Sequence, residues 1–511
     1  MDRSIVHQLE ASVIAHGDRG AIRHDALEVT YNQLWSMVRA VCGFFRRRVN
    51  RGDRVILALP NGVEYVAAYY GIIAAGAVVV PLRPDARNSE LAAMASRVEA
   101  KWLITEGADH AREASCAQPP TLGVVLVGSR FPGVSSDAPV VAWDAILTEG
   151  SSDPDYDALN DSDRLTTLAC TSGTTGNPKA VMITNGNLEA NTRSILGYLH
   201  LQQEDTGLCL LPLNYAYGTS ILNTHMAAGA RLVIGNGMAY PHVVRELLAQ
   251  EEVSGFFGVP TTYYLALQHG LFAQPLPRLR YLAQAGGGMR ADAVDQVRAQ
   301  LPGVAFYVMY GQTEATARLT WLPPERWTEK RGSIGMAIPG VELSIRDEEG
   351  KCVVHGSIGE LCARGQNIMA GYWRNPKATD EVLRDGWLHT GDLSWQDADG
   401  YFYLVGRADE MIKSGGHRFS PGAVEEVIAR HPDVKEVAVV GIDDELLGQV
   451  VRAVVVPLPE SSPGVNTLLR FCRHHLPPHM LPRELLFSDQ LPTTPSGKVR
   501  RKMLAGMRWT A

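Results

Sequence analysis

No stretch of the sequence is apolar for long enough to cross a membrane, and the amino terminus carries no segment of the signal-peptide type. The longest apolar stretch, residues 66–80, contains two tyrosines and two glycines and fits a buried helix that leads into a strand. Residues 1–10 include four ionisable side chains, which excludes the apolar core of a secretory signal. We therefore expect a protein without a membrane span.

Cysteine is sparse, and its spacing indicates no metal site. The seven cysteines include no Cys-x-x-Cys pair, have no histidines at zinc-binding spacing and are odd in number. This pattern argues against a zinc site and predicts a reduced, cytoplasmic setting.

An excess of positive charge is also missing. The formal net charge is −7 at pH 7 and the pI is about 6.1, and the basic residues are scattered apart from short clusters at 46–48 and 500–502. This balance argues against a broad nucleic-acid-binding surface, so we expect no nucleic-acid partner. The sequence has no internal repeat of the kind that builds solenoids.

The length and composition are those of a globular protein with more than one domain. The chain has 511 residues, of which 45% are hydrophobic and 20% are charged. Short apolar runs alternate with helical patterns, as in 55–59, 62–75 and 78–82, and the alternation resumes between residues 208 and 309. It predicts an α/β fold with parallel strands joined by right-handed crossovers.

Two changes of pattern divide the chain. From about residue 332, short strands separated by Gly and Asp turns predict a β-rich subdomain, and from residue 409 a compact α+β pattern begins. We therefore predict a large N-terminal domain at 1–407, with its β-rich subdomain at about 332–407, and a small C-terminal domain at 408–511.

A loop rich in hydroxyl groups and glycine follows the predicted strand at 165–170 and precedes a helical pattern at 185–199. Glycines let backbone N–H groups approach a phosphate, and hydroxyl groups add donors, so the loop predicts a phosphate-binding site. An ordinary polar surface loop is the alternative interpretation. The predicted phosphate-binding residues are Thr171, Ser172, Gly173, Thr174, Thr175, Gly176 and Lys179.

The spacing in this loop differs from that of the P-loop of nucleotide hydrolases. That P-loop places a lysine directly after its second glycine, whereas Gly173 and Gly176 are three residues apart here and Lys179 lies three residues further on. A P-loop hydrolase or kinase is therefore the disfavoured alternative, and steady phosphate release without a carboxylic acid would support it.

The loop resembles the signature of the adenylate-forming superfamily, which includes acyl-CoA synthetases, adenylation domains of peptide synthetases and beetle luciferases. Five further stretches match the pattern of that superfamily in the same order, at 310–314, 387–393, 406–409, 414–421 and 495–498. The resemblance implies a large AMP-binding domain, a small mobile C-terminal domain with its hinge at Asp409, and the use of ATP and Mg²⁺.

The resemblance assigns nucleotide contacts to several residues. Tyr310 would stack on adenine, the Thr313 hydroxyl would meet the α-phosphate, and Glu314 would help to hold magnesium, for which a carboxylate oxygen is suited. A capping threonine with a first-turn glutamate is the alternative. Asp392, in a predicted tight turn, would accept both ribose hydroxyls, and Arg407 would also contact the ribose. An ordinary turn aspartate is the alternative for Asp392.

The predicted small domain carries the remaining implied roles. Gly415 and Gly416 would form the turn that is presented to the thiol acceptor. Lys498 matches the catalytic lysine of the superfamily, whose mobile positive charge offsets the negative charge at the α-phosphate during adenylation. Arg501 and Lys502 are expected to be solvated.

One stretch departs from the superfamily pattern and bears on the substrate. Residues 212–218 place Tyr215 at an aromatic position and Ala216 where peptide-synthetase domains have an aspartate that pairs with an α-ammonium group. Because alanine cannot pair with an ammonium ion, we do not expect an ordinary α-amino acid as substrate. Core packing is the alternative for each pocket residue. The predicted acyl pocket contains Tyr215, Ala216, Phe257, Gly286 and Gly288, and Gly287 is assigned to the nucleotide.

These assignments predict an ATP-dependent, AMP-forming carboxylic acid ligase. The acid would attack ATP to give an acyl-adenylate and pyrophosphate, and a thiol would then displace AMP. The thiol belongs to coenzyme A, which the double glycine at 415–416 favours, or to the 4′-phosphopantetheine of an acyl or peptidyl carrier protein acting in trans. A stand-alone amino acid adenylation enzyme, an amide-forming ligase, a luciferase-like oxidative enzyme and a non-catalytic nucleotide sensor stay as alternatives.

Overall fold

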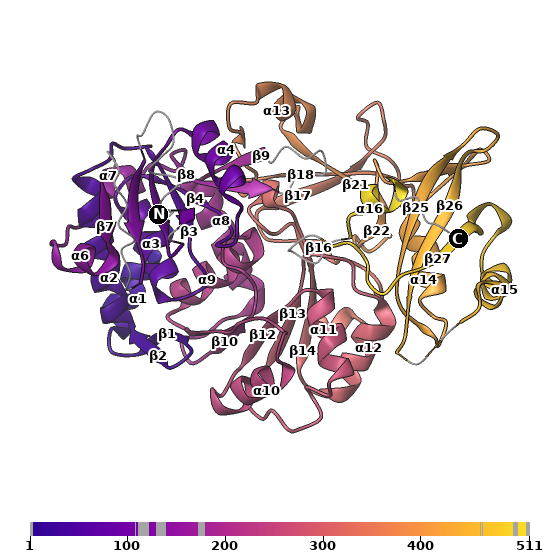
Figure 1. Cartoon of the computed structure of the whole chain (residues 1–511), viewed down its shortest axis with the longest axis horizontal. Helices are drawn as coiled ribbons and strands as arrows, with labels where there is room; N and C mark the ends of the chain where they lie inside the picture. The colour runs from indigo at the N-terminus through magenta and orange to yellow at the C-terminus, as the bar shows by residue number, and fades with distance from the viewer. Residues whose placement is uncertain are drawn as a thin grey trace. The chain divides into compact units, whose positions relative to one another are not determined.

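A computed structural model describes residues 4–506 except 108, 111–121, 129–138, 172–178, 460, 462 and 494–498. Figure 1 shows its helices and strands in chain order by colour. The chain divides into two units. Unit 1 comprises Met1–Arg326, Ala337–Glu342 and Arg364–Leu388, and unit 2 comprises Trp327–Met336, Leu343–Ala363 and His389–Ala511.

The first sheet of unit 1 has nine strands, in the order β16-β15-β14-β13-β12-β10-β11-β1-β2. The strands from β14 to β1 run parallel to one another, whereas β15 and β2 pair antiparallel with their neighbours. The strands are β1 (Gly20–His24), β2 (Leu27–Thr30), β10 (Thr206–Cys209), β11 (Arg231–Ile234), β12 (Gly255–Gly258), β13 (Tyr281–Gln284), β14 (Ala305–Tyr310), β15 (Thr320–Leu322) and β16 (Met336–Ala337).

The second sheet has eight strands, in the order β19-β9-β8-β4-β3-β5-β6-β7. Its two antiparallel pairs are β19–β9 and β9–β8, and the other pairs are parallel. The strands are β3 (Arg54–Ala58), β4 (Val78–Pro81), β5 (Ala100–Thr105), β6 (Gly123–Leu126), β7 (Val140–Ala142), β8 (Leu165–Thr171), β9 (Lys179–Thr184) and β19 (Gly371–Tyr372).

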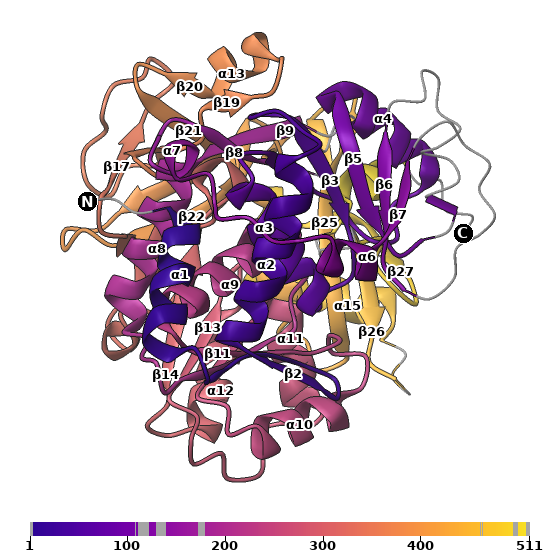
Figure 2. The ribbon, with the colours of Figure 1, turned by 90° about the vertical axis from the view of Figure 1, so that its left-hand side faces the viewer.

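A layer of helices lies between these two sheets, as Figure 2 shows. Helix α3 contacts β3 and β4 of the second sheet and β1 of the first, and Glu64 is its one residue that is not buried. A helix that is apolar on all sides is stable only when it is enclosed in this way. The helices of this layer are α1 (Ile5–His16), α2 (Tyr31–Arg46), α3 (Val63–Ala74), α8 (Asn185–Leu199) and α9 (Ala216–Ala228).

The remaining helices of unit 1 are shorter or more polar. Proline occupies the first turn of three of them, where its missing N–H is not needed. They are α4 (Asn88–Val98), α6 (Trp143–Thr148), α7 (Tyr156–Leu159), α10 (Pro241–Gln250), α11 (Pro260–Gln268), α12 (Ala291–Gln300) and α13 (Pro376–Val382), with the 3₁₀ turns η1 (Thr313–Ala315) and η2 (Pro324–Arg326).

A five-stranded sheet has the order β17-β18-β21-β20, with β22 beside β21, and the division into units passes through β17, β18 and β21. Its pairing of β21 with β22 is antiparallel. The strands are β17 (Val341–Arg346), β18 (Gly359–Gly365), β20 (Leu383–Arg384), β21 (Trp387–Gln396) and β22 (Phe402–Arg407).

The last sheet, in unit 2, has the order β24-β23-β26-β25, with β27 beside β26. Val424 of α14 and Leu468 of α15 pack on one face of it, and Leu504 of α16 packs on the other. The elements are β23 (Ile412–Ser414), β24 (His417–Phe419), β25 (Val434–Asp444), β26 (Gly448–Pro457), β27 (Pro482–Phe487), α14 (Pro421–Ile428), α15 (Val465–His475), α16 (Arg501–Gly506) and η3 (Pro478–Met480).

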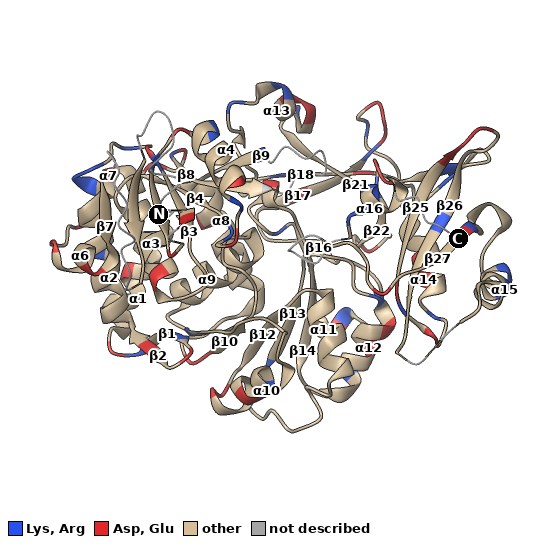
Figure 3. Cartoon of the chain, in the orientation of Figure 1, with Lys and Arg blue, Asp and Glu red and all other residues tan. Residues whose placement is uncertain are grey.

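The predicted fold class is confirmed: unit 1 is an α/β structure with parallel-rich sheets, and the chain continues into a smaller α+β region. No helix within the described residues combines the length and apolarity needed to cross a bilayer. Figure 3 shows positive and negative residues interspersed along the elements of each unit.

Candidate functional site

Several predicted site residues follow the carboxyl ends of neighbouring parallel strands in the nine-stranded sheet. Strands β10, β12, β13 and β14 lie side by side. Tyr215 follows β10, the exposed glycines 286–288 follow β13, and Tyr310 ends β14. Ligands of open α/β sheets bind at this edge because the loops there leave backbone groups and side chains accessible.

The turn after Tyr310 is tightly constrained. A Cβ atom at Gly311 would lie 2.0 Å from the carbonyl oxygen of Ala317, so only glycine fits. Thr316 and Ala317 have φ angles of 54° and 110°, which are unusual for residues other than glycine. The Asn367 amide donates to the carbonyl oxygens on either side of this pair, at 3.1 and 2.8 Å, and the Thr316 hydroxyl donates to the Asn367 carbonyl at 2.7 Å. Such strain occurs at functional sites, and the sequence pattern gave no signal for Asn367.

Thr313 and Glu314 lie in the short turn η1. Its N-cap residue is Gln312, whose side chain makes no capping hydrogen bond, so capping does not explain Thr313. The Glu314 carboxylate accepts a hydrogen bond at Oε1 from the Tyr372 hydroxyl, at 2.8 Å. Its second oxygen has no hydrogen-bond partner among the described residues. A carboxylate with one oxygen available is a suitable donor for magnesium, so the residues fit the predicted ion.

Lys179 begins β9 and lies beside the same tyrosine. Its Nζ atom is 4.6 Å from the centroid of the Tyr372 ring. Backbone pairing of Thr171 with Lys179 closes the β8–β9 hairpin around the predicted phosphate loop. Ser172, Gly173, Thr174, Thr175 and Gly176 lie outside the described residues.

The start of α9 carries the residues predicted to face the acyl group. Tyr215 is the N-cap of α9 and Ala216 its first residue. The Asn61 side chain fixes the preceding segment, because it donates to the Leu211 carbonyl at 2.9 Å and accepts from the Leu213 N–H at 2.8 Å. Burial raises the pKa of Tyr215, so its hydroxyl stays protonated.

Tyr217 is a second aromatic residue at this edge that the motif assignment missed. Its hydroxyl donates to the Ala283 carbonyl at 2.8 Å, and the guanidinium carbon of Arg318 lies 4.3 Å from its ring centroid. A Cβ atom on Gly286, which has φ +85°, would lie 3.1 Å from Cγ1 of Val259 and 4.0 Å from the Tyr217 ring. Glycine at 286 therefore keeps the space beside Tyr217 open.

Two other predicted residues have clear structural surroundings. Phe257 is 1% exposed and packs edge-on against His225 and Tyr281, which matches the core-packing alternative. The Gly287 carbonyl accepts a hydrogen bond at 2.7 Å from the buried amide of Gln284, which fixes the backbone of the glycine run. Gly288 has open space where a Cβ would lie.

Asp392 was predicted in a tight turn, and this prediction is wrong: it lies within β21, paired with Arg407 of β22. The Arg407 guanidinium donates to the Thr390 carbonyl at 3.1 Å and lies 3.4 Å from the Asp392 carboxylate. Gly391 has a φ of +73°, which makes the backbone irregular within this strand. The composition of the stretch alone had suggested a turn there. The antiparallel pairing thus brings the two predicted ribose contacts together within unit 2.

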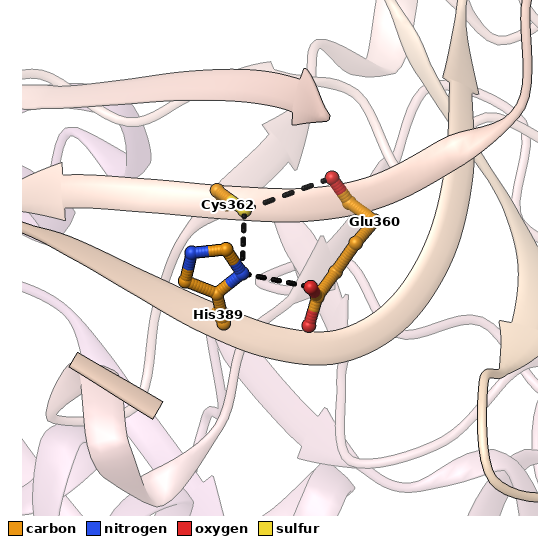
Figure 4. Close-up of side chains that lie close together, drawn as sticks. All are labelled: Glu360, Cys362 and His389. Carbon is orange, nitrogen blue, oxygen red and sulfur yellow. Dashed lines mark hydrogen bonds and ion pairs between the residues drawn. The ribbon is translucent and has the colours of Figure 1, made fainter. Parts of the chain in front are cut away.

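Glu360, Cys362 and His389 form a cluster next to this pair (Figure 4). Glu360 bonds His389 Nδ1 at 2.7 Å with one oxygen and accepts from the Gly391 N–H at 3.0 Å with the other, and Cys362 Sγ lies 3.4 Å from the same Nδ1. Two light-atom ligands of a tetrahedral zinc ion would lie about 3.3 Å apart. The 2.7 Å distance from Glu360 to His389 Nδ1 is shorter, which indicates hydrogen bonding instead. The cluster is therefore a clamp that holds the backbone at Gly391, directly before Asp392.

Gly415 and Gly416 form the two-residue turn between β23 and β24. Both have positive φ, at 56° and 81°, which is the backbone that a tight hairpin requires and that glycine adopts at little cost. The Gly415 N–H donates to the Leu447 carbonyl at 3.0 Å, and both glycines are exposed.

Lys498 lies outside the described residues, but both sides of its segment are fixed. Thr493 and Val499 form a β-bridge. Arg501, which was predicted to be solvated, is instead 24% exposed in its side chain and pairs with Glu425 and with Glu410, the latter at 3.0 Å. That prediction is wrong because Arg501 reaches the carboxylates across the sheet, a contact that local sequence cannot show. Lys502 is exposed, as expected.

The described cysteines are free thiols. Burial raises the pKa of Cys170 and of Cys209 to about 12, so neither is a nucleophile at neutral pH.

Comparison with known proteins covers nearly the whole chain. The family model for AMP-binding enzymes matches residues 9–373, and the model for the AMP-binding enzyme C-terminal domain matches residues 423–498. A feruloyl-CoA synthase of Amycolatopsis sp is 34% identical over 94% of each chain, and an oxalate–CoA ligase of Arabidopsis thaliana is 30% identical over 89% of this chain and 88% of its own.

Solved structures show the same similarity. The o-succinylbenzoate CoA synthetase of Bacillus subtilis, bound to its acyl-adenylate, has a TM-score of 0.86 at 25% identity and covers 98% of both chains. MatB of Rhodopseudomonas palustris, bound to ATP, has a TM-score of 0.87 at 25% identity over 99% of this chain and 98% of its own. The extent of these matches shows that the chain belongs to the family of AMP-binding, adenylate-forming enzymes.

Proposed function

We propose that the protein is an ATP-dependent, AMP-forming acid–thiol ligase that converts a small carboxylic acid into its coenzyme A thioester. The observation that carries this proposal is the match, over 94% of both chains, to a protein named as a CoA synthase. Coenzyme A is therefore the proposed acceptor in preference to carrier-bound phosphopantetheine. The free thiols suit the cytoplasmic setting that the sequence predicts.

In the proposed first half-reaction the substrate carboxylate attacks the α-phosphate of ATP. Pyrophosphate leaves and an acyl-adenylate forms. Glu314 would hold Mg²⁺, which offsets phosphate charge, while Lys179 and the loop at 171–176 bind the departing phosphates. Tyr310 would stack on adenine, with Gly287 beside it. Thr313 would contact the α-phosphate.

Unit 2 would supply the remaining nucleotide contacts. Asp392 would accept the ribose hydroxyls, Arg407 would donate to the ribose, and Lys498 would stabilise the charge that develops at the α-phosphate. A rotation about Asp409 would then bring the turn at 415–416 to the adenylate, where the thiolate attacks the acyl carbon and AMP leaves. The proposed domain limit stays at 407/408.

The acid is proposed not to be an ordinary α-amino acid. Ala216 begins α9 without a carboxylate, and Asp85, whose charge contributes to the raised pKa of Tyr215, is already paired with Arg83 at 3.2 Å. An α-ammonium group would therefore lack a free counter-charge at this position.

Acid-dependent exchange of radiolabelled pyrophosphate into ATP tests the proposal. Aliphatic, aryl, β-amino and α-amino acids are compared, and acids that support exchange are then supplied with coenzyme A or with a phosphopantetheinyl carrier protein. We expect exchange with a non-α-amino acid and a thioester with coenzyme A. Phosphate release without any acid would contradict a ligase, and strong exchange with an α-amino acid would contradict the argument from Ala216.

A further inference from the structure

We propose that Tyr372 is a positioning residue for the metal-bound triphosphate, because its hydroxyl orients Glu314 and its ring supports Lys179. This inference deepens the proposed function and rests on it. Tyr372 belongs to none of the stretches through which the sequence resembles the superfamily, and only the structure brings it to the other two residues.

The backbone of Tyr372 is fixed to the strand that begins with Lys179. β19 pairs antiparallel with β9, so Tyr372 lies opposite Val181. The Trp373 N–H donates to the Ala180 carbonyl at 2.8 Å, and the Tyr372 N–H donates to the Thr379 hydroxyl at 2.9 Å. The Tyr372 residue is 5% exposed. Its ring therefore has little freedom to move away from the start of β9.

The hydroxyl group determines which oxygen of Glu314 is available. It donates to Oε1 at 2.8 Å, and the Met369 N–H fixes the Glu314 carbonyl at 2.9 Å. The carboxylate is thus held at its backbone and at one oxygen, and Oε2 is left for a ligand. A carboxylate that is oriented in advance binds a hard cation more tightly than one that must be ordered on binding.

Lys179 and Glu314 both contact Tyr372, but they do not form an ion pair with each other. Lys179 Nζ lies 4.6 Å from the ring centroid, a cation–π distance, whereas Glu314 forms no ion pair with any described cation. A direct Lys179–Glu314 ion pair would have to be broken before a metal-bound triphosphate could enter. Tyr372 thus contacts both groups, and its hydroxyl leaves Oε2 of Glu314 for a metal ion.

Binding of Mn²⁺ in the presence of ATP tests this inference without turnover. Mn²⁺ prefers the same oxygen ligands as Mg²⁺, and its free concentration is measured by electron paramagnetic resonance with no acid added. Tyr372→Phe keeps the ring and removes the hydroxyl, and we expect about tenfold weaker ATP-dependent Mn²⁺ binding, as for a lost hydrogen bond to a charged group. Tyr372→Leu also removes the ring, and we expect metal-free ATP to bind about threefold more weakly as well.

Tyr31→Phe is the matched control, since Tyr31 is also buried and its hydroxyl donates to the Ala230 carbonyl at 2.7 Å. In a Glu314→Gln background, Tyr372→Phe should change Mn²⁺ binding by less than about twofold, because the two groups act together. Unchanged Mn²⁺ binding by Tyr372→Phe, or an equal loss in both backgrounds, would overturn this inference alone. If the unsubstituted protein binds no Mn²⁺ with ATP, the proposed function falls as well.

Discussion

Lys179, Tyr372 and Glu314 of unit 1 come from segments far apart in the chain, which the pairing of β19 with β9 and side-chain contacts bring together. Asp392 and Arg407 of unit 2, in contrast, are partners in one antiparallel ladder and need only the pairing of two consecutive strands. Substitution in the first group should therefore alter ligand binding strongly. Backbone pairing maintains the second group, so single side chains beside it should matter less.

The largest effect is expected at Lys498, which tests whether unit 2 also supplies chemistry. Lys498→Ala should slow adenylate formation by at least ~100-fold, because a mobile cation at the α-phosphate is lost. Thioester formation from synthetic acyl-adenylate should continue. Rapid-quench assays of each half-reaction measure both rates, with the exposed Lys502→Ala as control. Normal adenylate formation by Lys498→Ala would show that Lys498 of unit 2 does not stabilise the charge at the α-phosphate.

The free energy of unfolding of unit 1 should fall in acid, which distinguishes it from unit 2. His225 of α9 is fully buried in unit 1, and burial lowers its pKa to about 4 from about 6.5. As the pH falls, His225 is therefore protonated at a higher pH in the unfolded chain than in the folded chain. Its contribution to the free energy of unfolding is present above pH 6.5 and is lost as the pH falls toward 4. Between pH 7 and pH 5 the loss is about 2 kcal/mol.

Denaturant unfolding at several pH values, followed separately for each unit by hydrogen exchange, measures this loss. His225→Gln should flatten the pH dependence of unit 1. His431→Gln, a substitution of a histidine in unit 2 that is 9% exposed, should leave unit 1 unchanged. An identical acid profile for wild type and His225→Gln would show that His225 is not the cause.

Substitutions around β21 test whether backbone pairing, rather than side-chain contacts, positions Asp392. Asp392→Asn should weaken ATP binding about tenfold, because an acceptor of two hydroxyl hydrogen bonds is lost. Glu360→Gln should weaken it only about threefold, because the ladder still holds Asp392 when the Gly391 clamp is altered. Calorimetric titration with ATP measures both, and Glu342→Gln, at an exposed ion pair, is the control. An equal loss for both substitutions would show that the clamp, and not the ladder, positions Asp392.

The smallest effect concerns the hairpin turn of unit 2. Ala at position 416 would have open space for its Cβ but would keep a φ near +81°, which costs about 1 kcal/mol. Gly416→Ala should lower the melting temperature of unit 2 slightly and slow thioester formation more than adenylate formation. Gly506→Ala, also with open space but without a positive φ, is the matched control.

Local pattern was sufficient for most of the secondary structure. The predicted segments at 55–59, 62–75, 78–82 and 185–199 agree with β3, α3, β4 and α8 to within one residue at each end, because burial periodicity and the chemistry of helix and strand ends act over a few residues. The AMP-binding family was also readable from short motifs, since each motif is a continuous stretch that binds one part of a nucleotide.

Contacts between distant segments were not readable in this way. The sequence could place Lys179 and Glu314 in motifs, but it gave no sign that Tyr372 touches both, that Asn367 braces a strained turn, or that Arg501 is held by Glu425. The sequence also suggested a turn at Asp392, but the structure has a strand there, which continues through Gly391 in spite of its positive φ. Composition and periodicity record which face of an element is buried, whereas the partner of each side chain depends on how the sheets pair and pack.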